Sequence, residues 1–155
     1  MSVAFRRESD EEHKEPRFEL PLPSGPNLVT ARGLSLIGDR VRALEASIAA
    51  ETEAEVLEAL RRDLRYWHTR QTTAEVAPVP GGDSVAIGSR VAFRMAGRER
   101  RIDIVGHDEA DPAADRIAFS APLAAAMLGA EPGEMVDFNG KAEAIEILDT
   151  APIPD

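Results

Sequence analysis

The chain of 155 residues is long enough for one ordinary domain or two small ones, and it is too short for a barrel enzyme or a complete dinucleotide-binding fold. Its 28 acidic and 18 basic residues give a net charge of −10, which argues against direct binding to nucleic-acid phosphates. The absence of cysteine excludes disulfides and zinc fingers, and the three histidines are far apart in the sequence. We therefore expect no catalytic residue, no cofactor site and no metal site.

Residues 1–26 mix charged residues with prolines and a glycine and show no helical or strand periodicity, which predicts a disordered acidic tail. No stretch approaches the roughly 18 consecutive apolar residues that a membrane span requires, and the N-terminal stretch lacks an apolar signal core. We expect a monomeric, cytoplasmic protein that does not contact a membrane.

Two apolar stripes with heptad spacing predict an antiparallel coiled-coil hairpin over residues 27–77. When the stripes are paired antiparallel they share a single axis at residue 54, and each arm of about 20 residues should be about 30 Å long. A heptad stripe is also compatible with an intermolecular zipper, but two matched stripes around a short polar turn favour a hairpin within one chain. The stripes consist of Leu34, Ile37, Val41, Leu44 and Ile48, and of Leu57, Leu60, Leu64, Trp67, Gln71 and Ala74.

Glutamates crowd the expected tip of the hairpin, and two interpretations are open. In the first, Thr52 and Glu55 form a capping box and Glu53 complements the helix dipole, which leaves only Glu51 unexplained. In the second, the tip residues Glu51, Glu53 and Glu55 deliver carboxylates to a partner, for instance to a magnesium ion in the partner's active site.

Three arginines, Arg61, Arg62 and Arg65, form a basic run on the second arm. The simplest interpretation is a solvated face whose arginines pair with Asp39 or Glu45. The alternative is a surface that contacts an anionic partner.

After a proline- and glycine-rich linker at residues 78–84, the pattern predicts a small α+β domain over residues 85–150 and a short tail at 151–155. Pro122 and Gly129 mark the two ends of a short helix. The HDEAD stretch, residues 107–111, is interpreted as an acidic turn between strands. The expected strands are a hairpin through Val91, Phe93, Met95, Ile102 and Ile104 that turns at Ala96 and Gly97, and three further strands at residues 117–119, 135–138 and 144–148.

The segment from Ile104 to Phe138 resembles the C-terminal domain of the bacterial Gre transcript-cleavage factors, the GreA/GreB-like family. It contains IVG, then EAD, then a strand that ends just before a proline-leucine pair, a short helix and a glycine-acid-x-valine turn. Residues 27–33, NLVTARG, are similar to the start of that family's N-terminal coiled coil. The matching positions are Ile104, Val105, Gly106, Glu109, Ala110, Asp111, Pro122, Leu123, Leu128, Gly129, Gly133, Glu134 and Val136.

The resemblance implies an α+β protein in which a helical coiled-coil hairpin precedes a small FKBP-like strand domain with one short helix. In that family the strand domain docks on the rim of the secondary channel of RNA polymerase, and the coiled coil enters the channel. The implied docking loop is Ser120, Ala121, Pro122 and Leu123, with Ala121 in place of the usual serine. A purely structural alternative is that Ser120 caps the short helix that Pro122 begins.

The tip departs from the family pattern, because the aspartate and the glutamate-asparagine pair of cleaving members are absent from it. The coil is also shorter, as in the relatives known as regulators of nucleoside diphosphate kinase. We therefore expect a non-enzymatic regulator of elongation that binds core RNA polymerase, without efficient transcript cleavage and without sequence-specific nucleic-acid binding.

The first alternative is a factor that stimulates the cleavage of backtracked RNA by sharing the Mg²⁺ of the polymerase. The resemblance also makes RNA or the polymerase the anionic partner that the basic run could contact. An FKBP-like prolyl isomerase is a third possibility, but the sequence predicts no convincing aromatic pocket for it.

Overall fold

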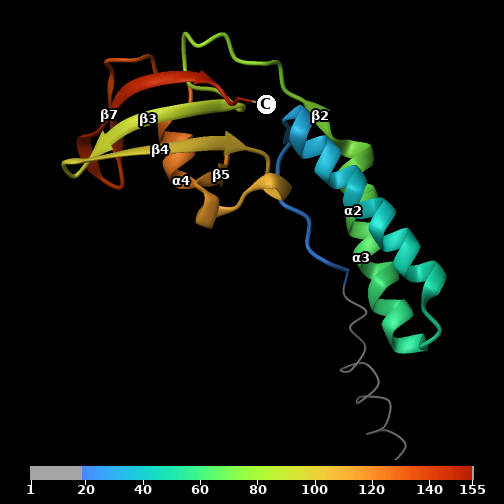
Figure 1. Ribbon diagram of the computed structural model, residues 1–155. Helices are drawn as coiled ribbons and strands as arrows, with labels where there is room; N and C mark the ends of the chain where they lie inside the picture. The colour runs from blue at the N-terminus through green and yellow to red at the C-terminus, as the bar shows by residue number, and fades with distance from the viewer. Residues whose placement is uncertain (1–18, 155) are drawn as a thin grey trace, which may run out of the picture.

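The computed structural model describes residues 19–154, in which a long helical hairpin adjoins a small twisted sheet (Figure 1). Most of the segment for which the sequence predicts disorder, residues 1–18, lies outside the described residues. The elements in chain order are β1 (Leu28–Val29), α2 (Ala31–Ala50), α3 (Ala54–Thr73), β2 (Glu75–Val76), β3 (Ser89–Met95), β4 (Arg98–Val105), the 3-10 helices η1 (His107–Glu109) and η2 (Pro112–Ala114), β5 (Arg116–Ala118), α4 (Pro122–Met127), β6 (Met135–Phe138) and β7 (Lys141–Pro152).

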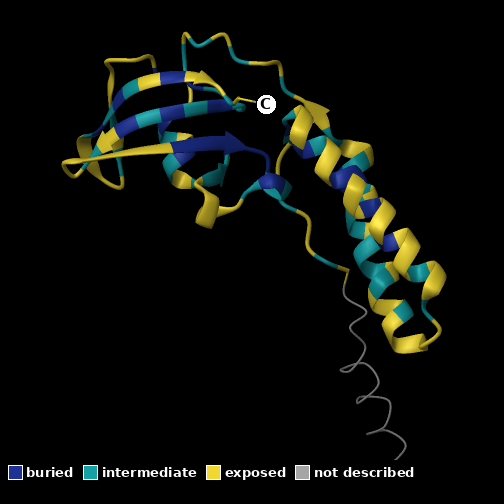
Figure 2. Cartoon of the chain, in the orientation of Figure 1, coloured by how far each residue is buried: buried dark blue, intermediate teal, exposed yellow. Residues whose placement is uncertain are grey.

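The predicted hairpin is confirmed, with 20 residues in each of its two helices. Ile37, Val41 and Leu44 of the first stripe are buried, and Figure 2 shows separate buried patches along α2. The turn comprises residues 51–53 and therefore lies slightly before the predicted axis. Thr30 caps α2, because its side-chain oxygen accepts a hydrogen bond from the amide of Gly33.

The base of the hairpin is closed by a short parallel ladder that the sequence did not predict. Leu28 of β1 pairs with Glu75 of β2, and Val29 pairs with Val76. Strands of two residues are too short to show a period of two, so no apolar alternation marked them. The ladder connects the start of α2 with the end of α3 at the base of the hairpin. This base lies against the sheet domain.

The sheet domain has the strand order β5-β4-β3-β7-β6, with only β5 parallel to its neighbour. The predicted β3–β4 hairpin is confirmed, and its turn residues Ala96 and Gly97 both have positive φ, at 53° and 76°, as a tight hairpin turn requires. The predicted strand at 135–138 is confirmed, whereas β7 extends beyond the predicted 144–148 at both ends, because it pairs with β6 from Lys141 and with β3 as far as Pro152.

One face of the sheet packs against α4 and forms the core of the domain. Pro122 begins α4 as predicted, and Gly129 follows its end with a φ of 84°. The core consists of Val85, Val91, Phe93, Ile102, Ile104, Ala124, Met127, Ala130, Ile145 and Ile147. Within residues 19–154, no helix is both long enough and apolar enough to span a membrane.

Candidate functional site

The hairpin tip holds its three candidate glutamates in different ways. The Glu51 carboxylate folds back on the turn, where its Oε1 accepts hydrogen bonds from the amides of Thr52, at 3.0 Å, and Glu53, at 3.1 Å. Glu53 and Glu55 are exposed at the start of α3. Among the described residues, no group of three or more acids and histidines is arranged to hold a metal ion.

The capping box predicted for the tip is wrong. The residue that precedes α3 is Glu53, and it makes no side-chain cap hydrogen bond, so Thr52 does not act as the cap. The physical reason is that Glu51 already satisfies the two amides of the turn, and the helix begins at Ala54. Glu51, which the sequence left unexplained, is therefore the tip acid with a structural role.

The predicted docking loop, Ser120 to Leu123, connects β5 with α4. Ala121 is the residue that precedes the helix, so the alternative in which Ser120 caps α4 is wrong. Ser120 Oγ instead lies 2.7 Å from the Nε2 of His107 in η1. Pro122 is exposed, whereas Leu123 is half-buried against the core of the sheet domain. Ser120 and Pro122 are therefore the loop side chains most available to a partner.

His107 connects this loop with the base of the hairpin. Its ring centroid lies 5.0 Å from that of Phe119, and its Nδ1 is buried without a hydrogen-bond partner in the described structure. Burial lowers the pKa of His107, the positive charge of Arg70 lowers it further, and the carboxylate of Asp108 opposes both. The neutral imidazole is therefore favoured at this position.

Asp108, the next residue of η1, binds α3. Its Oδ1 accepts a hydrogen bond from the hydroxyl of Tyr66 at 2.6 Å, and its Oδ2 accepts one from Nε of Arg70, also at 2.6 Å. Arg70 donates a further hydrogen bond to the side chain of Asn27, at 2.8 Å. The ion pair between Arg70 and Asp108 is buried, with side-chain exposures of 4% and 6%.

Glu109, the last residue of η1, binds α2. Its Oε1 accepts a hydrogen bond from the hydroxyl of Thr30, the residue that caps α2, and its Oε2 accepts one from Arg32 at 2.8 Å. The side chain of Glu109 is only 4% exposed, whereas that of Arg32 is 52% exposed. The carboxylate is therefore buried between the sheet domain and the first turn of the hairpin.

Two glycines allow this close approach. A Cβ on Gly106 would lie 2.6 Å from the backbone oxygen of Leu28, and a Cβ on Gly33 would lie 2.9 Å from Oε1 of Glu109. HDEAD lies in the connection between β4 and β5, as predicted, and its residues Asp108 and Glu109 are in addition hydrogen-bonded to the hairpin, which was not predicted. The sequence did not predict these contacts between η1 and the hairpin. The buried residue Glu109 is, however, the first residue of the EAD pattern that the family resemblance includes.

The arginine run on α3 is not paired as predicted. Arg65 binds Glu19, with its Nε 2.9 Å from Oε2, and Arg62 lies 3.9 Å from its neighbour Asp63. The acids expected as partners are engaged elsewhere, because Asp39 pairs with Arg42 and Glu45 lies 3.8 Å from His68. The prediction failed for Arg65 because Glu19, in the described segment that leads to β1, supplies the carboxylate that binds it.

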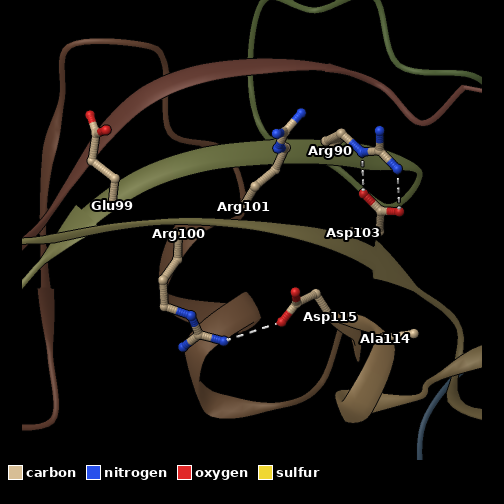
Figure 3. A pocket seen from close by; sticks show the side chains of 7 residues that line it. All are labelled: Arg90, Glu99, Arg100, Arg101, Asp103, Ala114 and Asp115. Atoms are coloured by element: carbon tan, nitrogen blue, oxygen red, sulfur yellow. Dashed lines mark hydrogen bonds and ion pairs between the residues drawn. The ribbon is translucent and has the colours of Figure 1, made fainter.

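A hollow of about 570 Å³ on the sheet domain lies away from the tip and the docking loop. Figure 3 shows that two of its arginines face acids: Arg90 donates two hydrogen bonds to Asp103, and Arg100 lies 3.8 Å from Asp115. Arg90 and Arg100 therefore have acidic partners, whereas Arg101, which also lines the hollow, forms no ion pair within residues 19–154.

Taken together, the predicted site residues fall into two separate places (Figure 1). The tip acids lie at the free end of the hairpin, and the loop from Ser120 to Leu123 lies on the sheet domain beside the hairpin base. The fold and these surfaces define a two-part protein in which a sheet domain carries a projecting helical hairpin.

Comparisons with known proteins identify the family. Residues 80–151 match the family described as transcription elongation factor, GreA/GreB, C-terminal. The chain is 30% identical over 139 residues to the transcription elongation factor GreA of Pseudomonas putida, a match that covers 88% of this chain and 84% of that protein. The chain therefore belongs to the GreA/GreB family.

Other relatives match over a shorter length. GreA of Rhizobium etli is 38% identical over 71 residues, which cover 43% of this chain and 45% of the relative, so the match spans a little under half of that protein. Among solved structures, the elongation factor GreA/GreB of Nitrosomonas europaea aligns with 83% of this chain and 99% of its own, at 18% identity and a TM-score of 0.39.

Proposed function

We propose that this protein regulates transcription elongation by binding core RNA polymerase at its secondary channel, without stimulating efficient transcript cleavage. The docking loop, Ser120 to Leu123, binds the rim of the channel, and the hairpin enters it. The protein acts as a cytoplasmic monomer and carries no cofactor of its own. Family membership supports the partner, because the relatives in the comparisons are named transcription elongation factors.

One observation carries the proposal: a hairpin with 20 residues in each arm projects from the sheet domain with its tip away from the docking loop. At 1.5 Å per residue each helix is about 30 Å long, so a protein held by its sheet domain can place the tip far inside a partner. Docking requires only shape and the exposed loop, and these remain even though the tip lacks the family's cleavage signature.

The structure of the hairpin tip supports a regulator that acts by filling the channel of the polymerase. A cleavage factor must offer carboxylate oxygens to a metal ion, because Mg²⁺ binds hard oxygen ligands at about 2.1 Å. Here Glu51 is occupied by two backbone amides, which leaves Glu53 and Glu55 as the exposed acids at the tip. A short hairpin that fills the channel affects pausing, initiation and the access of other factors without supplying ligands.

The alternative function is stimulation of cleavage of backtracked RNA by the polymerase. The exposure of Glu53 and Glu55 at the free end of the hairpin favours it. In that case these two carboxylates would help to hold a second Mg²⁺ in the active site of the polymerase, which itself performs the hydrolysis. The protein is not an enzyme under either function.

Binding is tested by titrating the protein against core RNA polymerase and comparing Pro122→Glu with Pro132→Glu. Both prolines are exposed on the sheet domain, and an acid in the first turn of α4 is compatible with the helix dipole. We expect Pro122→Glu to weaken binding about tenfold or more, equivalent to about 1.4 kcal/mol, and Pro132→Glu to leave it unchanged. If the unmodified protein does not bind at micromolar concentration, the proposed function is wrong.

Cleavage is tested in stalled, backtracked elongation complexes with the triple variant Glu51→Ala, Glu53→Ala and Glu55→Ala. The control is Glu58→Ala, which removes an exposed acid further along α3. We expect the unmodified protein to add no RNA shortening to the intrinsic activity of the polymerase. Shortening that the triple variant abolishes and the control retains would establish the alternative function.

A further inference from the structure

Three consecutive residues of η1 connect the docking loop with both helices of the hairpin. His107 contacts Ser120, Asp108 binds α3, and Glu109 binds α2. We infer that Asp108 and Glu109 are positioning residues that fix the direction and the rotation of the hairpin relative to the docking loop. The functional meaning of this inference rests on the proposed function, because the direction of the hairpin matters only if the tip must reach a defined place in a partner.

The two carboxylates constrain different motions because they hold different helices. An attachment to α3 alone, through Arg70, would still allow the hairpin to rotate about that point. The second attachment, from Glu109 to Thr30 and Arg32 at the start of α2, prevents this rotation. The two attachments fix the line between them, and the close approach of Gly106 to the backbone oxygen of Leu28 opposes rotation about that line.

Because these charged side chains are buried, one orientation of the hairpin is favoured over the others. The side chains of Arg70, Asp108 and Glu109 are between 4% and 6% exposed. A buried charge is tolerated only with its partner in place, because an unpaired ion in a poorly solvated site is strongly unfavourable. A hairpin that swings away must therefore either rehydrate these groups or leave them unpaired, and both changes oppose the movement.

The middle of the covalent connection between the two parts is exposed and makes none of the hydrogen bonds that join them. After the hairpin the chain reaches the sheet domain only through the segment between β2 and β3, where Val79 is 80% exposed. Figure 1 shows this segment as an open loop above the junction. Within residues 19–154, the side-chain hydrogen bonds between the hairpin and the domain all come from η1, and the close approach of Gly106 to the backbone oxygen of Leu28 adds to them.

The inference is tested by measuring the distance between spin labels at Thr52→Cys on the tip and Ala142→Cys on β7, in the full chain and without a partner. The protein has no cysteine of its own, so only these positions are labelled. One junction variant combines Arg70→Met with Asp108→Asn, and the other combines Arg32→Ala with Glu109→Ala. The control combines Arg94→Met with Glu146→Gln, which removes an exposed ion pair of the sheet.

We expect a narrow distance distribution in the unmodified protein and in the control, and a distribution roughly twice as wide in each junction variant. Tyr66→Phe should keep it narrow, because both ion pairs remain. A distribution that stays narrow in the folded junction variants overturns the inference. If the Arg70 variant does not fold, as judged by circular dichroism, the Arg32 variant decides, because Arg32 is half exposed and its loss is tolerated more easily.

A second measurement with core RNA polymerase separates this inference from the proposed function. The junction variants should bind within about twofold of the unmodified protein, because the docking loop is unchanged, while crosslinking from a photoreactive group at residue 52 should fall about fivefold or more. Absence of polymerase binding by the unmodified protein overturns the proposed function but leaves the distance result intact. Unchanged crosslinking in variants with widened distances shows that the junction does not position the tip in the complex.

Discussion

Gly106→Ala tests how tightly the sheet domain approaches the hairpin. The new Cβ would lie 2.6 Å from the backbone oxygen of Leu28, about 0.8 Å inside the 3.4 Å of ordinary contact. Because the obstacle is backbone in the β1–β2 ladder, no side-chain rotation relieves the overlap. Forced overpacking of this kind costs about 1–3 kcal/mol.

The backbone of Gly106 does not itself require glycine, since its φ of −77° and ψ of 173° suit alanine. Replacing glycine with alanine at such a position stabilises a protein by about 0.4–1 kcal/mol, because it lowers the conformational entropy of the unfolded chain. We therefore expect a net loss of about 1–2 kcal/mol in the free energy of unfolding. The clash is relieved by moving η1 away from β1, which lengthens the contacts of Asp108 and Glu109.

The assay is urea unfolding, followed by far-UV circular dichroism and by the fluorescence of Trp67, the only tryptophan. The matched control is Gly81→Ala, whose Cβ meets only a side-chain oxygen of Asp83, at 4.0 Å. The control should be as stable as the unmodified protein or slightly more so. A Gly106→Ala protein with undiminished stability would refute the reasoning, because it would mean that η1 and β1 are not in rigid contact.

Three further outcomes are expected. Glu51→Ala should destabilise the hairpin by about 0.5–2 kcal/mol and speed hydrogen exchange at the tip amides. Glu51→Gln keeps an oxygen that accepts hydrogen bonds, so its loss of stability should be smaller. Tyr66, the only tyrosine, should ionise near pH 12 in an absorbance titration, because burial and its bond to Asp108 raise its pKa to about 12; its contribution to stability is present below pH 10 and lost as the pH rises toward 12. Because the pKa of His107 is lowered in the folded protein, the unfolded chain binds a proton at this imidazole at a higher pH than the folded chain does. The free energy of unfolding should therefore decrease as the pH falls below about 6.5. The decrease should be smaller in His107→Gln, which has no imidazole to protonate. A single ionisation near pH 10 would contradict the tyrosine prediction, and equal losses in both proteins would contradict the histidine prediction.

The sequence by itself determined the architecture. The heptad stripes through Ile37 and Leu64 required two helices that bury a shared seam, because only that arrangement removes both stripes from water. Alternation through Val91 and Phe93 fixed which face of β3 enters the core, and Pro122 fixed the start of α4, since these signals are local and repeat at the period of the element that they specify.

Only the tertiary structure decided which acids have structural roles. Glu51, Glu53 and Glu55 are alike in sequence, and the turn conformation alone makes Glu51 the acceptor for two amides. Asp108 and Glu109 find their partners 38 to 79 residues earlier in the chain, on helices that nothing near HDEAD identifies. A buried ion pair depends on the placement of both elements in space, and no periodicity along a single chain segment encodes that distance.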